Sequence, residues 1–202
     1  MLKKIRKALI EKRENPYPEI EPTSLYPVEE DSLDIVFAEE LTRVNGQFLY
    51  CEDHLQLVEN LLTLSSEKKW KHIYCWENKI QAMLRECEFP FHSGDKNFEQ
   101  ADAGITLCEA LVARNGSILV SSAQNSGRRL SVYPHAHIVI AYSSQLVADL
   151  KDGFQLLKEK YGDRMPSYTG VITGPSRTAD IEKTLVLGAH GPRELYVLLL
   201  EE

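Results

Sequence analysis

The sequence predicts an α/β fold, with a largely parallel sheet covered by helices and an antiparallel hairpin joined to it. Two observations predict this fold class. Short apolar segments alternate with segments of helical periodicity over residues 47–87, as in parallel sheets whose strands are connected by helices. Later, Asn115-Gly116 separates two apolar segments, and this dipeptide is a strong signal for an antiparallel turn.

The chain has 202 residues, of which 43% are hydrophobic and 26% are charged, and this composition is typical of a globular protein. The formal net charge of −7 argues against general binding to nucleic acids or anionic membranes, because both need a basic surface. No apolar run reaches the roughly 20 residues of a membrane span, and the N-terminus lacks the apolar region of a signal peptide. We therefore expect a soluble cytoplasmic protein.

The cysteine pattern predicts free thiols. The chain has Cys51, Cys75, Cys87 and Cys108, and none belongs to a C-x-x-C pair. The sequence thus encodes neither a zinc motif nor an iron–sulfur motif. We expect reduced, mostly buried thiols, as is usual in the cytosol, and no cofactor held by this chain.

The N-terminal region differs from the rest. Residues 1–14 have one apolar and one basic helical face, and prolines at 16, 18, 22 and 27 predict a stiff connector. The sequence therefore predicts a helix and connector over 1–30, followed by an α/β domain over 31–202. Two interpretations of the helix fit equally: it packs on a neighbouring subunit in a homo-oligomer, or on its own domain.

The first part of the α/β domain is expected to contain three helices and two strands. The first helix begins at Asp31 or Ser32, which are good caps, and runs to about Val44. The second begins at Asp53 and the third covers 79–87. Strands are expected over 47–51 and 72–76. The apolar face of the second helix is predicted to consist of Leu55, Val58, Leu61 and Leu62.

The second part begins with an apolar strand over 103–107 and the hairpin of 110–113 and 117–120. A loop over 121–129 and a strand over 137–142 follow. Residues 144–161 predict a helix whose inner face holds Leu146, Val147, Leu150, Phe154 and Leu157. Strands are expected over 168–173 and 195–200, and the latter is nearly all apolar, which predicts an interior position.

The best candidate ligand site is the glycine-punctuated segment 173–192. Gly174 and Pro175 form a turn after a strand, and Ser176 or Thr178 is placed to cap a following helix. A helix N-terminus with Arg177 would attract an anion, and open α/β sheets bind ligands beyond the carboxyl ends of strands. The alternative is a purely structural helix whose Arg177 pairs with Asp180 or Glu182.

A second turn, Leu187-Gly-Ala-His-Gly-Pro-Arg193, precedes the last strand. Gly188 and Gly191 let the backbone approach a ligand. His190 is a candidate acid–base group, as is Asp180. The competing interpretation of His190 is a turn histidine that binds the backbone.

Other candidates are weaker. Gly104 and Thr106, followed by Glu109, could present a hydroxyl and a carboxylate, although a solvated Glu109 fits as well. His135-Ala-His137 has the alternation that suits a metal, yet no third ligand is evident, so no metal site is predicted. The basic loop 124–129 either adds cationic side chains to an anion site or is plain surface.

Two stretches resemble a known family. Residues 174–182 have the sequence Gly-Pro-Ser-Arg-Thr-Ala-Asp-Ile-Glu, and residues 185–194 have Leu-Val-Leu-Gly-Ala-His-Gly-Pro-Arg-Glu. They resemble the C-terminal signature of the LUD domain, the lactate utilization family of LutC and YkgG type. Together with Ala103-Gly-Ile-Thr106, 134–139 and 145–150, the resemblance covers roughly residues 95–200.

The resemblance implies a three-layer α/β/α fold with a Rossmann-like sheet, similar to the NagB/RpiA/CoA-transferase group. It also implies a role in lactate catabolism, as an accessory component in the oxidation of L-lactate to pyruvate beside partner proteins that hold iron–sulfur clusters. Because relatives in the wider fold group handle CoA esters, sugar phosphates or folates, an enzyme or binding protein for such an anionic molecule is the alternative. Ser176, Arg177, Thr178 and Asp180 are the implied ligand-facing side chains.

One position departs from the family pattern. The family has Glu-Thr before the hairpin glycine, where this chain has Arg114-Asn115 before Gly116. If that carboxylate contributes to binding or activity, this chain differs in that respect or uses Glu109 instead.

Overall fold

The computed structural model describes residues 2–10, 31–181 and 184–202. The chain divides into two compact units, residues 1–30 and residues 31–202. In the first unit, α1 (Leu2–Ile10) forms a helix where one is predicted. The expected proline-rich connector lies outside the described residues.

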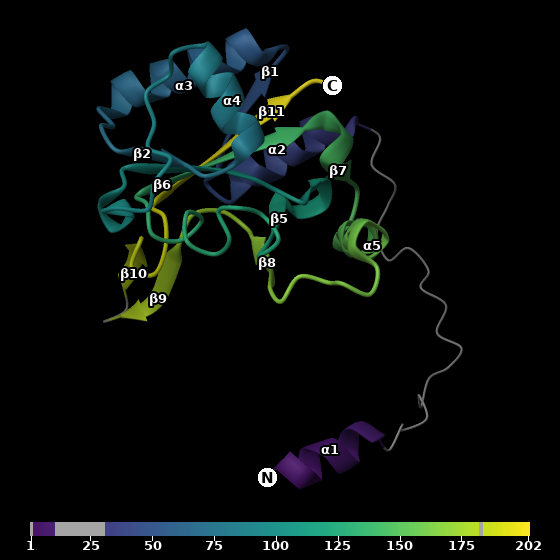
Figure 1. The fold of residues 1–202 in the computed structure, drawn as a ribbon. Coiled ribbons are helices and arrows are strands. Elements are labelled where there is room, and N and C mark those ends of the chain that lie inside the picture. The colour runs from purple at the N-terminus through teal and green to yellow at the C-terminus, as the bar shows by residue number, and fades with distance from the viewer. Residues whose placement is uncertain (1, 11–30, 182–183) are drawn as a thin grey trace. The chain divides into compact units, whose positions relative to one another are not determined.

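Five parallel strands form the central sheet of the second unit, in the order β1-β11-β6-β3-β2 (Figure 1). They are β1 (Gln47–Cys51), β2 (Ile73–Cys75), β3 (Ala103–Leu107), β6 (Ala136–Tyr142) and β11 (Glu194–Leu200). The sequence predicts a strand at all five places. Because β11 lies between β1 and β6, its six apolar residues 195–200 are at most 3% exposed, which confirms its predicted interior position.

Helices cover one face of this sheet (Figure 1). These are α3 (His54–Lys68) and α4 (Asn78–Glu86), and side chains such as Leu57 and Ile80 pack with every second residue of the strands, among them Ile138. The alternation follows from the pleat of a strand, which sends successive side chains to opposite faces. The parallel sheet with covering helices confirms the predicted α/β class.

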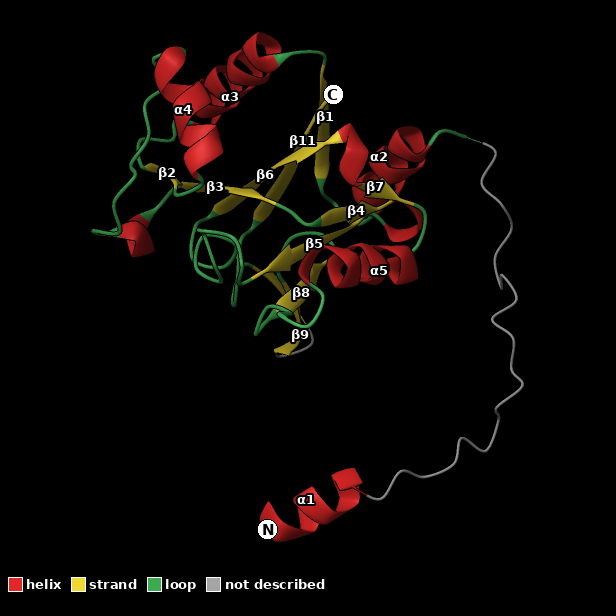
Figure 2. Ribbon diagram, turned by 45° about the vertical axis from the view of Figure 1, so that its right-hand side comes forward, coloured by secondary structure: helices red, strands yellow, loops and turns green. Residues whose placement is uncertain are grey.

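A second layer covers the other face (Figure 2). It consists of α2 (Leu33–Arg43) and a four-stranded sheet in the order β7-β4-β5-β8. The strands are β4 (Ala110–Val112), β5 (Ser117–Ser121), β7 (Leu146–Val147) and β8 (Thr169–Ile172). The β4–β5 hairpin is confirmed, but it belongs to this separate sheet rather than to the parallel one. On the far side of the small sheet lies α5 (Leu150–Tyr161), whose Leu157 packs against Leu119.

Gly116 is required at the hairpin turn. A short 3₁₀ turn, Ala113–Asn115, precedes it, and Gly116 has a φ of 60°. A Cβ at this position would lie 2.3 Å from the backbone nitrogen of Leu41 in α2. Glycine therefore serves two purposes here: it adopts the left-handed conformation and lets the hairpin contact α2 closely.

Two predicted helix faces are wrong in part. In α3 the buried side chains are Leu57, Val58, Leu61 and Leu64, whereas Leu55 and Leu62 are exposed. The spacing 57, 61, 64 fits a helical stripe better than the predicted set. In α5, Phe154 is exposed although it was predicted to face inward.

The helix predicted over 144–161 begins later. Residues Ser143–Gln145 form a 3₁₀ turn, Leu146 and Val147 form β7 beside β4, and α5 starts after its N-cap Asp149. Pairing with a strand edge outweighs the helical periodicity, because a short apolar run fits either structure.

Two further short elements complete the unit, the 3₁₀ turn Phe98–Gln100 and an antiparallel pair, β9 (Arg177–Ile181) with β10 (Thr184–Leu187). Among the described residues, no helix combines the length and the apolar character that crossing a membrane requires.

Candidate functional site

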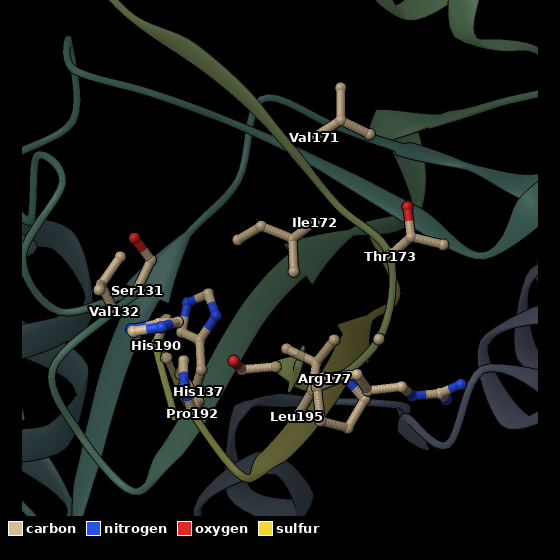
Figure 3. A pocket seen from close by; sticks show the side chains of 14 residues that line it. Ser131, Val132, His137, Val171, Ile172, Thr173, Arg177, His190, Pro192 and Leu195 are labelled. Carbon is tan, nitrogen blue, oxygen red and sulfur yellow. The ribbon is translucent and has the colours of Figure 1, made fainter. Parts of the chain in front are cut away.

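A pocket of about 310 Å³ lies beside the amino-terminal ends of β6 and β11 (Figure 3). Its wall consists of residues 131–132, 171–177 and 190–192, together with His137 and Leu195. Both parts of the predicted segment 173–192 therefore contribute to one pocket. The segment follows the carboxyl end of a strand, as predicted, but that strand is β8 (Thr169–Ile172) of a separate four-stranded sheet. Of the parallel strands, the pocket contacts the amino-terminal ends, because His137 and Leu195 are the second residues of β6 and β11.

The turn after β8 is fixed by contacts with the end of α2. Gly174 is buried and has a φ of 81°. A Cβ there would lie 2.4 Å from the carbonyl oxygen of Val44, the C-cap of α2. Nη2 of Arg177 donates a hydrogen bond to the same oxygen. A cation at a helix C-terminus is favourable, so Arg177 stabilises this wall. Its exposed side chain extends away from His137 and His190 (Figure 3).

The helix predicted after Gly174 is wrong. Residues 177–181 form β9, which pairs with β10. The backbone N–H of Ser176 donates to the carbonyl of Pro192 at 2.8 Å, and the N–H of Gly188 donates to the carbonyl of Ser176 at 3.0 Å. Because Ser176 bonds to the second turn and Thr178 lies in a strand, neither residue caps a helix. In the described residues of this segment, the expected anion cradle at a helix N-terminus is absent.

The second turn closes the pocket from the other side. Gly191 lies against Ser176, whose Cβ would be 3.1 Å from a Cβ added to the glycine. Gly188 has a φ of 74° and is packed against Arg193. His190 is exposed and lines both this pocket and an adjoining one of about 450 Å³, which also contacts Arg193 and His135.

One of the predicted ligand-facing residues, Thr178, lies outside the pocket wall. Thr178 pairs with Val186 in the β9–β10 hairpin and is absent from the pocket lining. Asp180 belongs to β9, and its side chain falls outside the described part of the chain.

A buried histidine forms part of the pocket wall. His137 is 1% exposed, and its Nε2 lies 2.9 Å from Oγ1 of Thr106 in the neighbouring strand β3. Its Nδ1 has no hydrogen-bond partner among the described residues. Burial lowers the pKa of His137 from 6.5 to about 4, so the imidazole is neutral near pH 7.

Gly104, which was predicted together with Thr106 as a candidate ligand-binding residue, has a packing role in β3. Gly104 is buried, and a Cβ there would lie 2.7 Å from the carbonyl oxygen of Leu130. The loop before β6 can approach β3 only because this side chain is missing. Gly104 thus positions the chain just before Ser131, which lines the pocket.

Glu109 is buried, which rules out the expectation of a solvated carboxylate. It accepts hydrogen bonds from Ser121 at 2.5 Å, Tyr161 at 2.9 Å and Lys160 at 2.8 Å. These partners come from β5 and α5, and Glu109 is not part of the pocket wall. Its contacts make it an anchor that holds α5 against the small sheet.

Arg114, which replaces the glutamate of the family pattern in the hairpin, forms an ion pair. Nε of Arg114 donates to Oδ2 of Asp149 at 2.9 Å. Asp149 is the N-cap of α5, so the ion pair links the hairpin turn to the start of that helix. A glutamate at position 114 would repel this carboxylate.

The basic loop 124–129 is held by a residue that the sequence did not single out. Glu77, the N-cap of α4, is 4% exposed and accepts hydrogen bonds from the backbone and the hydroxyl of Ser126 at 2.9 and 2.7 Å. Arg129 stacks over the Trp76 ring at 4.4 Å. The loop is therefore packed on the β2–α4 connection.

The four cysteines are free, and all but Cys87 are buried, as predicted. Burial raises the pKa of the Cys75 thiol to about 12. Over the described ranges, no three His, Cys, Asp or Glu side chains gather closely enough to hold a metal ion.

Comparison with known proteins identifies similar chains. Lactate utilization protein C of Bacillus licheniformis is 35% identical over 120 residues, which are 57% of this chain and 50% of that protein. The protein of the same name in Bacillus subtilis is 35% identical over 118 residues, covering 55% and 49%. The uncharacterized protein YkgG of Escherichia coli is 36% identical over 106 residues, covering 52% and 46%. The chain thus spans about half the length of the curated relatives it matches.

A solved structure shares the fold. A DUF162 family protein from Deinococcus radiodurans matches with a TM-score of 0.63 at 17% identity, covering 86% of this chain and 99% of that one.

The family model of the LUD domain matches residues 91–200. This range contains every residue of the pocket wall. Because the match extends over more than half of the sequence, the chain belongs to the LUD domain family.

Proposed function

We propose that this chain is a lactate utilization protein of LutC type. In this role it is a cytoplasmic accessory component in the oxidation of L-lactate to pyruvate. That oxidation releases two electrons and two protons, and the electrons pass to partner proteins that hold iron–sulfur clusters. The observation that carries the proposal is the family match over residues 91–200, because it includes the whole pocket wall and because the relatives that match are named lactate utilization protein C.

Affinity purification from native cells tests the partner role. The full chain, tagged and expressed at its natural level, is expected to recover an iron–sulfur protein when cells grow on L-lactate. An untagged strain is the control for nonspecific capture. Deletion of the gene is expected to abolish growth on L-lactate but not on pyruvate. Recovery of no iron–sulfur protein, or normal growth on L-lactate after deletion, would contradict the proposal.

A second candidate function is the binding of an anionic small molecule such as a CoA ester, a sugar phosphate or a folate, with or without catalysis. The observation that favours it is the pair of exposed side chains, Arg177 and His190, on the pocket wall. An arginine can bind a carboxylate or phosphate through two parallel hydrogen bonds.

Thermal-shift measurements with CoA, sugar phosphates, folate and lactate test this candidate. A ligand that binds only the folded state raises the melting temperature. The rise is expected to disappear in Arg177→Ala and to persist in Arg43→Ala, because Arg43 pairs with Glu40 on α2 and is absent from the pocket wall. The quantity to compare is the rise caused by ligand, since Arg177 also contributes a structural hydrogen bond to Val44. Equal rises in both variants would contradict the role of Arg177.

A further inference from the structure

The His137 side chain is the least explained polar group of the pocket. It belongs to the wall, it is 1% exposed, and its Nδ1 lacks a partner within the described parts of the chain. Figure 3 shows the imidazole projecting from β6 into the space beside Ser131 and Ile172. Buried polar atoms almost always find a hydrogen-bond partner, so an exception at a pocket wall points to a partner that arrives from outside.

The contact with Thr106 determines which nitrogen of the imidazole carries the proton. Oγ1 of Thr106 has Nε2 of His137 as its hydrogen-bond partner. If Nε2–H donated to this oxygen, the threonine proton would lack an acceptor. If the hydroxyl donates to Nε2 instead, its proton is satisfied and the neutral ring carries its own proton on Nδ1. Each arrangement leaves one proton without a partner among the described residues, the threonine proton in the first and Nδ1–H in the second. Thr106 is not part of the pocket wall and His137 is, so only the proton on Nδ1 can be satisfied by a molecule that enters the pocket. Nδ1–H is therefore a buried donor at the pocket.

The remaining wall defines the molecule that would accept this hydrogen bond. Beside His137 the wall consists of Ile172 and Leu195 together with Ser131, and the exposed His190 provides a polar group that remains in contact with water. A negative charge is best kept at such an exposed position, because burying it is costly. The buried donor then suits a neutral carbonyl oxygen. A volume of about 310 Å³ is at the small end of ligand sites.

We infer that His137 is the ligand-binding residue of this pocket and donates Nδ1–H to the oxo group of a small 2-oxo acid, whose carboxylate lies near His190. Thr106 is a positioning residue, which acts by holding the imidazole in this tautomer. The inference rests on the proposed function and narrows its ligand to the oxidised, 2-oxo form. The matching 2-hydroxy acid binds more weakly, because its hydroxyl brings a further proton that also needs an acceptor in the pocket.

Nitrogen NMR of the purified full chain tests the tautomer without any ligand. In ¹⁵N-histidine-labelled protein near pH 7, the signals of His137 are those that disappear in His137→Leu. They are expected to show a protonated Nδ1 and an unprotonated Nε2, and Thr106→Ser is expected to preserve this pattern. A protonated Nε2 in the wild-type protein would overturn the inference.

Titration with pairs of acids tests the ligand. The probes are pyruvate, 2-oxobutyrate and 4-methyl-2-oxopentanoate, each against its 2-hydroxy counterpart. We expect the 2-oxo acids to bind more tightly and to shift the Nδ1–H signal. His137→Leu is expected to weaken binding by at least about tenfold, and Thr106→Val to weaken it less. His137→Asn is expected to retain most of the affinity, because its amide nitrogen lies close to the position of Nδ1.

Three outcomes would overturn the inference: no binding by any acid, equal binding of the 2-oxo and 2-hydroxy forms, or equal binding by wild type and His137→Leu. Circular dichroism of each variant establishes that it is folded. These measurements use the isolated chain, whereas the partner role is judged by recovery of an iron–sulfur protein from cells. Failure of one is therefore distinguishable from failure of the other.

Discussion

At the residue scale, the hydrogen bond between Thr106 and His137 determines how the interior beside the pocket is stabilised. The two side chains lie on adjacent strands, and both are at most 1% exposed. A buried hydrogen bond adds little net stability, but removing one partner leaves the other without compensation. Replacing both partners by apolar side chains avoids that loss. The pair therefore predicts strongly non-additive mutational effects.

We expect Thr106→Val to lower the free energy of unfolding by roughly 1–3 kcal/mol, because Nε2 of His137 would lose its partner. The double variant Thr106→Val/His137→Leu is expected to be at least as stable as the wild type, because it also removes the unpaired Nδ1. Urea unfolding of the wild type, both single variants and the double variant measures the interaction. A double variant as unstable as the sum of its two single variants would contradict this expectation.

The same histidine predicts a pH dependence of stability. Burial lowers its pKa from 6.5 to about 4, so between these values the unfolded chain binds a proton that the folded chain does not. Stability therefore rises with pH over this window and is lost as the pH falls, by roughly 3 kcal/mol in total.

Urea unfolding at several pH values from 4 to 7 measures this dependence. The difference between wild type and His137→Leu isolates the contribution of His137 from that of the carboxylates. His190→Leu is the matched control, because it removes an exposed histidine from the same pocket. Parallel profiles for wild type and His137→Leu would show that His137 does not cause the dependence.

At the element scale, the sequence identifies the strands of the central sheet better than the elements around the pocket. Residues 195–200 are apolar without interruption, as is typical of a strand covered on both faces. By contrast, Ser176 and Thr178 after Gly174 suggested a capped helix. The β-branched residues Thr178, Ile181, Thr184 and Val186 were the available sign of a β-hairpin. What a periodicity argument cannot supply is the partner, here the backbone of Pro192 that bonds to Ser176.

The candidate site was predictable to a similar degree. Glycines identified two turns that meet at one pocket, because glycine signals special backbone geometry locally. His137 was considered only with His135 as a metal ligand, since alternation alone does not reveal burial. Its role depends on Thr106, which lies 31 residues away in sequence and next to it in the sheet.

The start of α5 provides an element-scale prediction. Asp149 accepts a hydrogen bond from the Lys151 N–H, Asp152 accepts one from the Asp149 N–H, and Arg114 pairs with the other oxygen of Asp149. Asp149→Ala is expected to lower the free energy of unfolding by about 1–2 kcal/mol, because it removes the N-cap. Asp149→Asn is the matched control and is expected to cost less than half of that, since asparagine caps equally well and loses only a partly exposed ion pair. Urea unfolding compares the two, and equal losses would assign the effect to the ion pair with Arg114 instead.

At the scale of the whole molecule, the apolar core formed by the described residues lies in the second compact unit. All four clusters of buried apolar side chains consist of residues from 36 to 200, within the unit of residues 31–202. The central sheet depends on its last strand, because β11 lies between β1 and β6. Without β11, the edges of β1 and β6 would be left unpaired, and the side chains that pack on both faces of β11 would be exposed.

This distribution predicts that residues 31–202 fold without the N-terminal unit. The shortened chain is expected to have the same urea midpoint as the full chain, because it keeps every residue of the four clusters. Light scattering of both chains tests in the same samples whether α1 (Leu2–Ile10) holds subunits together, since an oligomer built through α1 would lose mass on truncation. The control chain of residues 1–193 lacks β11 and is expected to remain unfolded, because removing an interior strand takes away its hydrogen bonds and six buried side chains at once. A lower midpoint for residues 31–202 would mean that the first 30 residues contribute to the stability of the second unit.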